Sequence, residues 1–258
     1  MRLVTYLLVL ASLIFMTACD LPHQPGPMPS DIVETEFEPG LNIIGVLRAD
    51  DVLGSSFVNV TRALTTEEIY SDTIENFSPL VDYVRVHSSS IDTEYVFVPL
   101  DDSSDTKTYS DTNLVVEAGL TYDIEISAPG FPVLTGETSI PQKPQLVANT
   151  LSVTTDNISF QLQHHSSAFE YKLYIIFSEQ ALERVVKPTN GTLIDIDWDF
   201  DTGNGTPQYL MLSALDENLV RYGNTPISFI PNTYHPDAST VSGGYGCFGS
   251  LSVVFVEL

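Results

Sequence analysis

The chain has 258 residues, of which 34 are acidic and 10 are basic, and its formal net charge is −24 at pH 7. A surface this acidic repels the phosphates of nucleic acids, which excludes a nucleic-acid partner. Because 43% of the residues are hydrophobic, the chain can form packed cores, which excludes an intrinsically disordered protein.

The first residues have the layout of a bacterial export signal. Arg2 precedes an uncharged apolar segment, residues 3–16, which is shorter than the roughly 20 residues that a membrane-spanning helix needs. The small pair Thr17-Ala18 then stands directly before Cys19, the arrangement at which a lipoprotein signal is cut and the cysteine receives acyl chains such as palmitate. We predict that residues 1–18 form this signal and that Cys19 is lipidated. The alternative is a plain secretory signal followed by a chance cysteine.

Residues 19–35 are predicted to be a tether. They contain four prolines between residues 22 and 29, and such a segment prefers extended conformations and cannot form a core. Stable anchoring needs more than one acyl chain, and bacterial lipoproteins carry several. We therefore expect the mature protein to be held at a membrane through its N-terminal lipid.

From residue 36 the pattern is that of short strands separated by turns. Residues 121–127 alternate most clearly, with Tyr122, Ile124 and Ile126 on one face and polar residues on the other. One helical turn is expected at residues 65–70. The other predicted strands, short and rich in apolar residues, are 41–47, 57–61, 81–86, 95–98 and 133–139. So many short strands with so little helix predict an immunoglobulin-like β-sandwich over residues 36–142.

Two prolines within residues 140–144 mark the expected boundary, because proline removes ladder hydrogen bonds. Beyond it, Leu182, Val185 and Val186 would share one face of a helix, so residues 178–186 are predicted to be helical. The remaining predicted strands are 158–163, 171–177, 193–200, 208–214, 226–229 and 251–256. We predict a second β-sandwich-like domain at residues 143–258, which makes the fold class all-β.

Alternating aspartates in residues 193–201 suggest a calcium site. Asp197, Asp199 and Asp201 precede a glycine-rich turn, and clustered carboxylates are the ligands that calcium prefers. However, a regular strand spaces such carboxylates about 6.6–6.8 Å apart, too far to share one ion. The alternative is an amphipathic strand with solvated carboxylates opposite a core face, and calcium requires the chain to bend at residues 199–205.

The other candidate sites have simpler structural explanations. Adjacent strand residues face opposite ways, so the pair His164-His165 is expected at a strand end rather than on a metal. Trp198 is expected in the core rather than as a platform for sugars, and Cys247 as a small buried residue. Residues 243–249, rich in glycine, are expected to form a tight, irregular approach to the last strand. The common hydrolase and nucleotide-binding signatures are missing, so no catalytic residue and no enzymatic activity are predicted.

Four segments together resemble a known family. They are residues 41–47, residues 119–131 running on to 138–141, residues 170–173, and residues 243–249. With these segments the chain is similar to a family of Bacteroidota cell-envelope lipoproteins that is described as a domain of unknown function, although it is short between residues 177 and 207. The family is often encoded near outer-membrane TonB-dependent transporters, and it has no catalytic residues that could be carried over.

The resemblance implies an envelope location, with a TonB-dependent transporter or another envelope protein as the expected partner. Asp20 would favour the inner membrane in some enteric bacteria, whereas the link with transporters favours the outer membrane. We expect a lipid-anchored, non-enzymatic binding or transporter-accessory protein of the bacterial cell envelope. The alternative is a calcium-dependent adhesion or glycan-binding module.

The lipidation of Cys19 can be tested by mass spectrometry of the protein isolated from its native membrane. We expect the mature N-terminal peptide to begin at Cys19 and to carry the mass of its acyl chains. The peptide that contains Cys247 is the internal control and is expected without a lipid. An unmodified Cys19 or an uncleaved signal would contradict the prediction.

Overall fold

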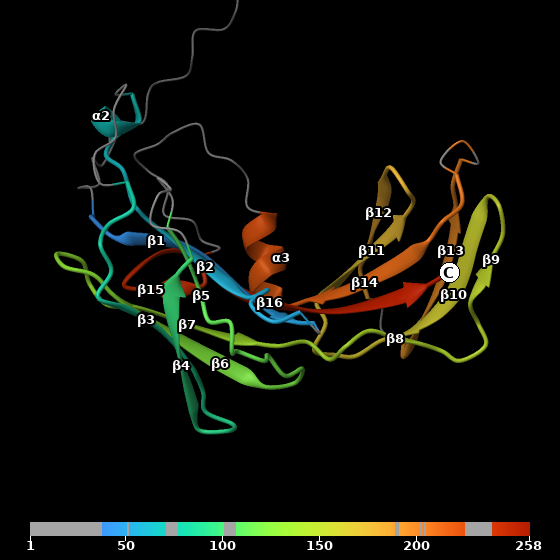
Figure 1. The fold of residues 1–258 in the computed structure, drawn as a ribbon, viewed down its shortest axis with the longest axis horizontal. Helices are drawn as coiled ribbons and strands as arrows, with labels where there is room; N and C mark the ends of the chain where they lie inside the picture. The colour runs from blue at the N-terminus through green and yellow to red at the C-terminus, as the bar shows by residue number, and fades with distance from the viewer. Residues whose placement is uncertain are drawn as a thin grey trace, which may run out of the picture. The chain divides into compact units, whose positions relative to one another are not determined.

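The computed structural model describes residues 38–50, 52–70, 77–100, 107–188, 191–201, 203, 205–224 and 239–258. The signal at residues 1–18, Cys19, the tether at residues 19–35 and the predicted strand at residues 226–229 lie outside these ranges. In the first half, most elements are short strands (Figure 1). They are β1 (Leu41–Ala49), β2 (Phe57–Arg62), α2 (Thr66–Ile69), β3 (Tyr83–Ser88), β4 (Thr93–Pro99), β5 (Lys107–Ser110), β6 (Thr121–Ser127) and β7 (Leu134–Ser139).

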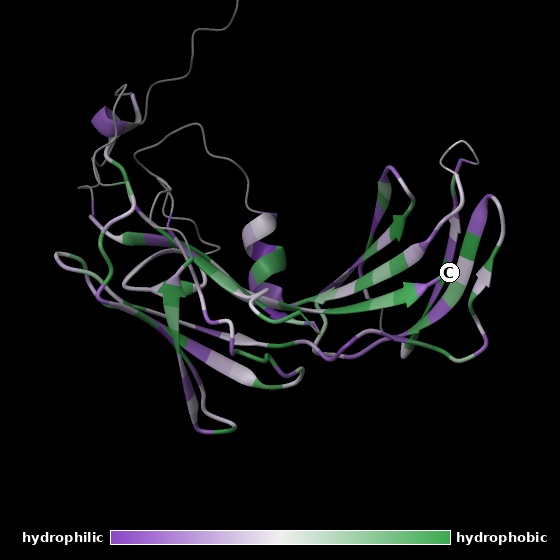
Figure 2. Cartoon of the chain, viewed as in Figure 1, coloured by the Kyte–Doolittle hydropathy of each residue, from purple (hydrophilic) through white to green (hydrophobic). Residues whose placement is uncertain are grey.

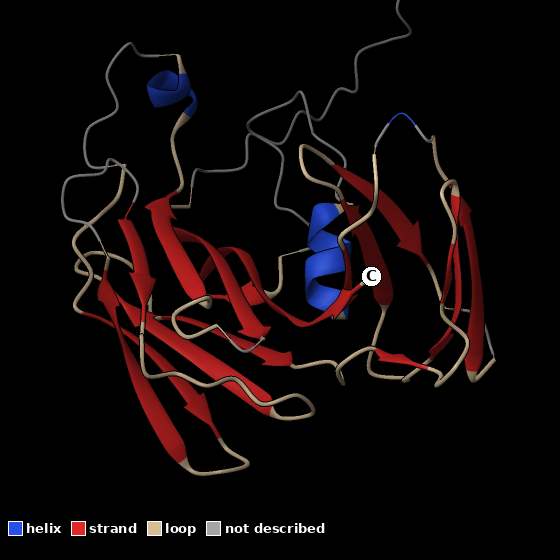
Figure 3. Ribbon diagram, turned by 45° about the vertical axis from the view of Figure 1, so that its right-hand side comes forward, coloured by secondary structure: helices blue, strands red, loops and turns tan. Residues whose placement is uncertain are grey.

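The second half is also rich in strands (Figure 3). Its elements are β8 (Gln145–Leu146), β9 (Ser152–Val153), β10 (Asn157–Gln163), β11 (Glu170–Ile176), β12 (Ala181–Val186), β13 (Leu193–Asp199), β14 (Tyr209–Leu215), α3 (Glu217–Gly223), β15 (Val241–Ser242) and β16 (Gly244–Glu257). The prediction of a mostly β chain is therefore confirmed. Neither helix in the described ranges has the length and apolar content to cross a membrane.

The predicted helix at residues 178–186 is wrong, because this segment contains strand β12. Leu182, Arg184 and Val186 are half-buried, and the residues between them are exposed, so the burial pattern has the period of a strand. β12 forms an antiparallel pair with β11 along its whole length. The apolar residues fit a helical period better, since Val185 points away from Leu182 and Val186 in the strand, and pairing with β11 decides the outcome.

Most strands belong to one long hydrogen-bonded path, in the order β12-β11-β14-β16-β1-β2-β5-β4-β3-β6-β7-β15. β16 joins the two parts of this path. Its Gly244–Ser252 part runs parallel to β1, and its Leu251–Glu257 part runs antiparallel to β14. The strands β13, β10 and β8 form a second sheet, with β9 beside β10.

Alternation of apolar and polar residues along these strands builds two hydrophobic cores (Figure 2). The first core uses inward residues of β1 to β7, including Tyr122, Ile124 and Ile126, as the sequence predicts. The second uses inward residues of β10, β11, β13 and β14. From β16, Phe248 packs in the first core and Val256 against the second. The last strand therefore contributes to both cores. The predicted domain boundary between residues 142 and 143 stays a prediction.

The glycine-rich segment lies against neighbouring backbone. Gly243 and Gly246 have φ values of +74° and +109°. A Cβ atom would overlap the carbonyl oxygen of Val133 at the first position and that of Ile43 at the second. The expected close backbone contact at glycines is therefore confirmed. The expected irregular conformation is wrong, because the strand already begins at Gly244.

A buried carboxylate, Asp216, connects α3 to two strands. Its Oδ1 accepts a hydrogen bond from the Leu219 amide at 2.9 Å, which caps the helix, and its Oδ2 accepts one from Thr138 Oγ1 of β7 at 2.6 Å. The Asp216 amide donates to the Ser250 carbonyl of β16 at 3.0 Å. Burial raises the pKa of Asp216 above its usual 3.8, and the hydrogen bonds from Thr138, Leu219 and Ser250 offset part of this effect.

Replacing Gly246 by alanine should destabilise the protein strongly. The added methyl group meets the backbone of β1, which cannot move without breaking its pairing, so we expect a loss of about 4 kcal/mol or more. Gly130→Ala is the control, because Gly130 also has a positive φ of +84° but nothing within 4 Å. This control should cost only about 1–2 kcal/mol. Urea unfolding measures both, and equal losses would contradict the close contact at Gly246.

Asp216 should make the stability depend on pH. Its folded-state pKa is raised, so its contribution to the free energy of unfolding is complete below about pH 3.8 and is lost as the pH rises through the folded-state pKa. Asp216→Asn removes this titration but keeps a capping side chain. The free energy of unfolding of the wild type minus that of the Asn variant should therefore fall from about pH 3 to about pH 7 in urea unfolding. A difference that does not change with pH would contradict the raised pKa. Asp216→Ala, which also loses the cap, should cost about 1–3 kcal/mol.

Candidate functional site

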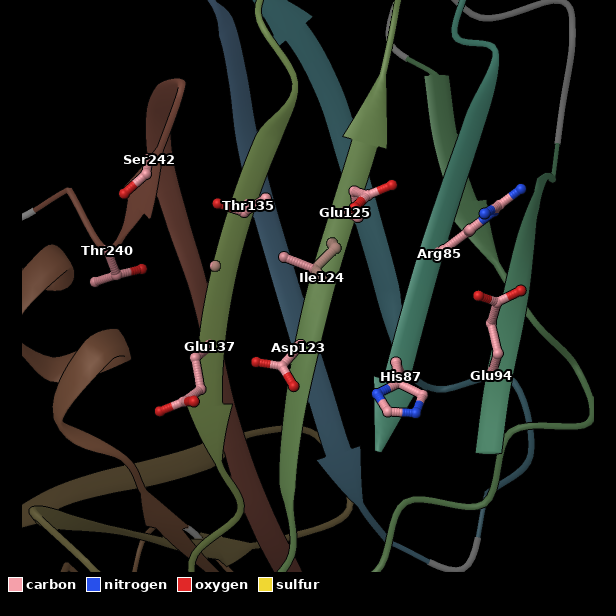
Figure 4. A pocket seen from close by; sticks show the side chains of 11 residues that line it. Arg85, His87, Glu94, Asp123, Ile124, Glu125, Thr135, Glu137, Thr240 and Ser242 are labelled. Carbon is pink, nitrogen blue, oxygen red and sulfur yellow. The ribbon is translucent and has the colours of Figure 1, made fainter. Parts of the chain in front are cut away.

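An open pocket of about 580 Å³ lies on the outer face of the sheet formed by β4, β3, β6 and β7 (Figure 4). Outward residues line it because their strand neighbours are buried in the first core: Tyr122, Ile124 and Ile126 turn inward, so Asp123 and Glu125 turn outward. The lining residues are Arg85, His87, Glu94, Asp123, Ile124, Glu125, Thr135, Gly136, Glu137, Thr240 and Ser242.

A row of ionisable side chains crosses four neighbouring strands in this pocket. His87 of β3 stands opposite Glu94 of β4 on one side and opposite Asp123 of β6 on the other. Asp123 in turn stands opposite Glu137 of β7. Side chains directly opposite each other have Cβ atoms about 4.5–5.5 Å apart, so these four are neighbours on one face. We call them the carboxylate row, because three of the four are acidic.

In the next row of outward side chains, the charged groups contact one another. Arg85 stands opposite Glu125, and its guanidinium lies 4.3 Å from the centre of the Tyr83 ring. The Tyr83 hydroxyl donates to Glu125 Oε1 at 2.5 Å. This hydrogen bond raises the pKa of Tyr83. Tyr83, Arg85 and Glu125 therefore form one closed group beside the carboxylate row.

The side chains of the carboxylate row have fewer hydrogen-bond and ion-pair partners among the described residues. Within the described ranges, Glu94, Asp123 and Glu137 have no hydrogen bond or ion pair from their side chains, and His87 Nε2 lies 3.6 Å from Asp92 Oδ1. Asp123 and Glu137 face each other, and like charges directly opposite destabilise a sheet. An added cationic group would relieve this repulsion and gain charge-assisted hydrogen bonds. The row can therefore bind a cation of molecular size.

The predicted calcium residues lie far along the chain from this pocket, on and just after β13. Asp197 and Asp199 are exposed, and both accept from Asn157 Nδ2, at 2.6 and 2.7 Å. Asp201 accepts instead from the Gly203 amide at 2.9 Å. Across the part of the chain that the structure describes, no three His, Cys, Asp or Glu residues are arranged to hold a metal ion. Two of the three candidates share an amide, and calcium at this position stays a prediction.

The other candidates take structural positions. His164 and His165 follow the end of β10, and both contact the Tyr171 hydroxyl, through the ring Nδ1 at 3.3 Å and the backbone amide at 3.1 Å. Trp198 is half-buried against the second core. Cys247 is fully buried, and this burial raises the pKa of its thiol to about 12, so it is a poor nucleophile. The expected burial of Cys247 is confirmed, and Trp198 packs against the second core while staying half-exposed.

The carboxylate row itself was missed from the sequence. The outward position of Asp123 follows from the alternation in residues 121–127, but nothing local shows which residues of other strands stand opposite it. Lysine and arginine are rare in this chain, 10 residues against 34 acidic ones. A histidine within a predicted strand is therefore the sequence feature that could have pointed to this row.

Comparisons with known proteins give only distant likenesses. No family model and no curated protein matches the chain. Among solved structures, pullulanase from Anoxybacillus sp. LM18-11 in complex with maltotriose is 9% identical over 68% of this chain, with a TM-score of 0.26. A DUF4785 family protein from Legionella pneumophila is 12% identical over 67%, with a TM-score of 0.26. Chicken CNTN1 domains FN1–FN3 are 12% identical over 83%, with a TM-score of 0.22.

The chain spans 24%, 52% and 67% of those three structures. At such low TM-scores the similarity assigns neither a family nor a function. The ligand of this protein must therefore be inferred from its own residues.

Proposed function

We propose that this protein is a non-enzymatic binding protein and that its carboxylate row receives a basic side chain of a partner protein. The observation that carries the proposal is the row itself: Glu94, Asp123 and Glu137 lie in register in an open pocket without partners among the described residues. A lysine or arginine offers several N–H donors to such a row. The net charge of −24 also attracts a basic partner over a longer range.

The surroundings of the row favour a protein as the source of that basic group. Val96 and Val98 of β4 point to the same outer face and are 51% and 56% exposed. Val96 stands opposite Arg85, next to the pocket. A partner that inserts a basic side chain can therefore also cover apolar surface, which a free metal ion or a small amine cannot do.

Binding suits the site better than catalysis. A hydrolytic nucleophile needs a base within hydrogen-bond reach, but within the described ranges no hydroxyl is hydrogen-bonded to His87. The hydroxyls that line the pocket belong to Thr135 on β7, Thr240 just before β15, and Ser242 on β15. The pocket is also open to solvent, whereas catalytic charges act most strongly where water is excluded.

We further propose that the protein acts at a bacterial membrane. Acylated Cys19 would hold it there, most favourably at the outer membrane, and the tether at residues 19–35 would separate the folded part from the lipid. An immunoglobulin-like sandwich at residues 36–142 would carry the carboxylate row, followed by the second sandwich-like domain at residues 143–258. The resemblance to transporter-associated lipoproteins supports an envelope transporter as the partner.

Basic peptides test the carboxylate row. The wild-type protein should bind a fluorescein-labelled hexa-arginine peptide, measured by fluorescence anisotropy in dilute buffer, and should not bind hexa-glutamate. Asp123→Asn with Glu137→Gln removes both charges of the opposed pair and should weaken binding about tenfold, because each charge-assisted hydrogen bond contributes about 1.5–3 kcal/mol before solvent screening.

The matched control removes two charges from another exposed strand. Asp195→Asn with Asp197→Asn makes the same change in net charge on β13, away from the pocket. This variant should bind the peptide nearly as well as the wild type. An equal loss in both variants would show attraction to the overall charge alone and would overturn the proposed site.

A further inference from the structure

Strand β12 lies at one end of the long hydrogen-bonded path and pairs only with β11 among the described elements. An end strand leaves half of its backbone N–H and C=O groups open to another chain. Other strand edges here are short or protected. β8, β9 and β15 have two residues each, and one face of β13 carries three carboxylates, Asp195, Asp197 and Asp199, whose charge opposes an added acidic or uncharged strand. β12 has six residues.

The pairing with β11 shows which groups of β12 are open. In the turn between the strands, the Phe177 amide donates to the Gln180 carbonyl at 2.8 Å, so this pair is hydrogen-bonded. Antiparallel pairs alternate between hydrogen-bonded and non-hydrogen-bonded. Residues 182, 184 and 186 therefore bond to β11, and the backbone groups of Ala181, Glu183 and Val185 point to the free edge.

The two charged residues of β12 do not protect this edge. Glu183 accepts a hydrogen bond from the Tyr174 hydroxyl on β11, and its Oε1 lies 3.9 Å from Lys172 Nζ. Arg184 points the other way: its Nη1 donates to the Asp197 carbonyl of β13 at 2.6 Å. Charged side chains normally keep other strands from an edge, but here both are bound elsewhere on the same molecule.

The face beside the open edge carries apolar and aromatic side chains next to the paired Lys172 and Glu183. Tyr174 of β11, Met211 of β14 and Phe255 of β16 stand in one row across the sheet. Val185 is 46% exposed and Phe255 is 55% exposed. Aromatic residues and methionine are enriched where proteins dock. Side chains of an added strand would extend this face beyond Val185.

We propose that the free edge of β12 receives an extended segment of another protein, which adds one strand to the sheet and places alternate apolar side chains over the face of Tyr174 and Val185. The three residues with outward backbone groups favour an extended segment as the ligand, because a helix or a glycan cannot form the same ladder of backbone hydrogen bonds. The net charge of −24 opposes pairing with a second copy of this chain. The partner segment is therefore neutral or basic. This site is independent of the carboxylate row.

A strand-forming peptide is the probe. We would use a fluorescein-labelled seven-residue peptide in which valine alternates with threonine and lysine, and a control peptide of equal charge that is N-methylated at alternate amides. Anisotropy should show binding of the first peptide only. Amide hydrogen exchange by NMR should show new protection at Ala181, Glu183 and Val185, while the amides of residues 182, 184 and 186 are protected before and after binding.

Two variants change the edge. Val185→Pro removes an outward N–H without touching the ladder to β11, and Val185→Lys adds a hydrated charge at the edge. Each should weaken peptide binding about fivefold or more. Val115→Lys, at a 55% exposed valine outside any strand, is the control and should bind as the wild type does. Thermal melting shows that each variant is folded.

Each outcome of these experiments either supports or overturns the proposal. Edge-specific protection together with loss of binding in both Val185 variants supports the proposal. Equal binding of the N-methylated peptide, or unchanged exchange at residues 181, 183 and 185, would overturn it. Sedimentation equilibrium adds one outcome: a dimer of the wild type that Val185→Pro dissociates would assign the edge to a second copy and overturn the proposed partner.

Discussion

The structure depends most on the double pairing of β16. This one strand hydrogen-bonds to β1 with its first part and to β14 with its second, so the ladder continues from one core to the other. The close approach to β1 requires glycine at position 246, where any side chain would overlap Ile43. Asp216 adds a second connection, because it caps α3 and bonds to both β7 and β16. Destabilising β16 therefore affects both cores rather than one.

The two proposed binding surfaces belong to different ends of this strand path. The carboxylate row crosses β4, β3, β6 and β7, and the open edge is β12. Their chemistry is also different: the row offers charge to a basic side chain, whereas the edge offers backbone hydrogen bonds to an extended segment. A partner could use either surface without the other.

How far the sequence could predict these features depends on whether the signal is local. The strand at residues 121–127 and its inward Tyr122 are visible from alternation alone, and the structure has both. Residues 178–186 show the limit, because Leu182, Val185 and Val186 would share one face of a helix, whereas in strand β12 Val185 points away from the other two. Pairing with β11 decides for the strand. The carboxylate row could not be predicted, since His87 and Asp123 are opposite only through the register of β3 and β6.

The sequence by itself determined the acidic surface, the strand-rich class and the inward position of residues such as Ile124, because charge and side-chain alternation are properties of a few consecutive residues. Only the tertiary structure decided that β16 serves both cores, that His87 and three carboxylates lie in one row across four strands, and that β12 has no second neighbour among the described elements. Strand order and register follow from contacts between residues far apart in the chain, and no local pattern contains them.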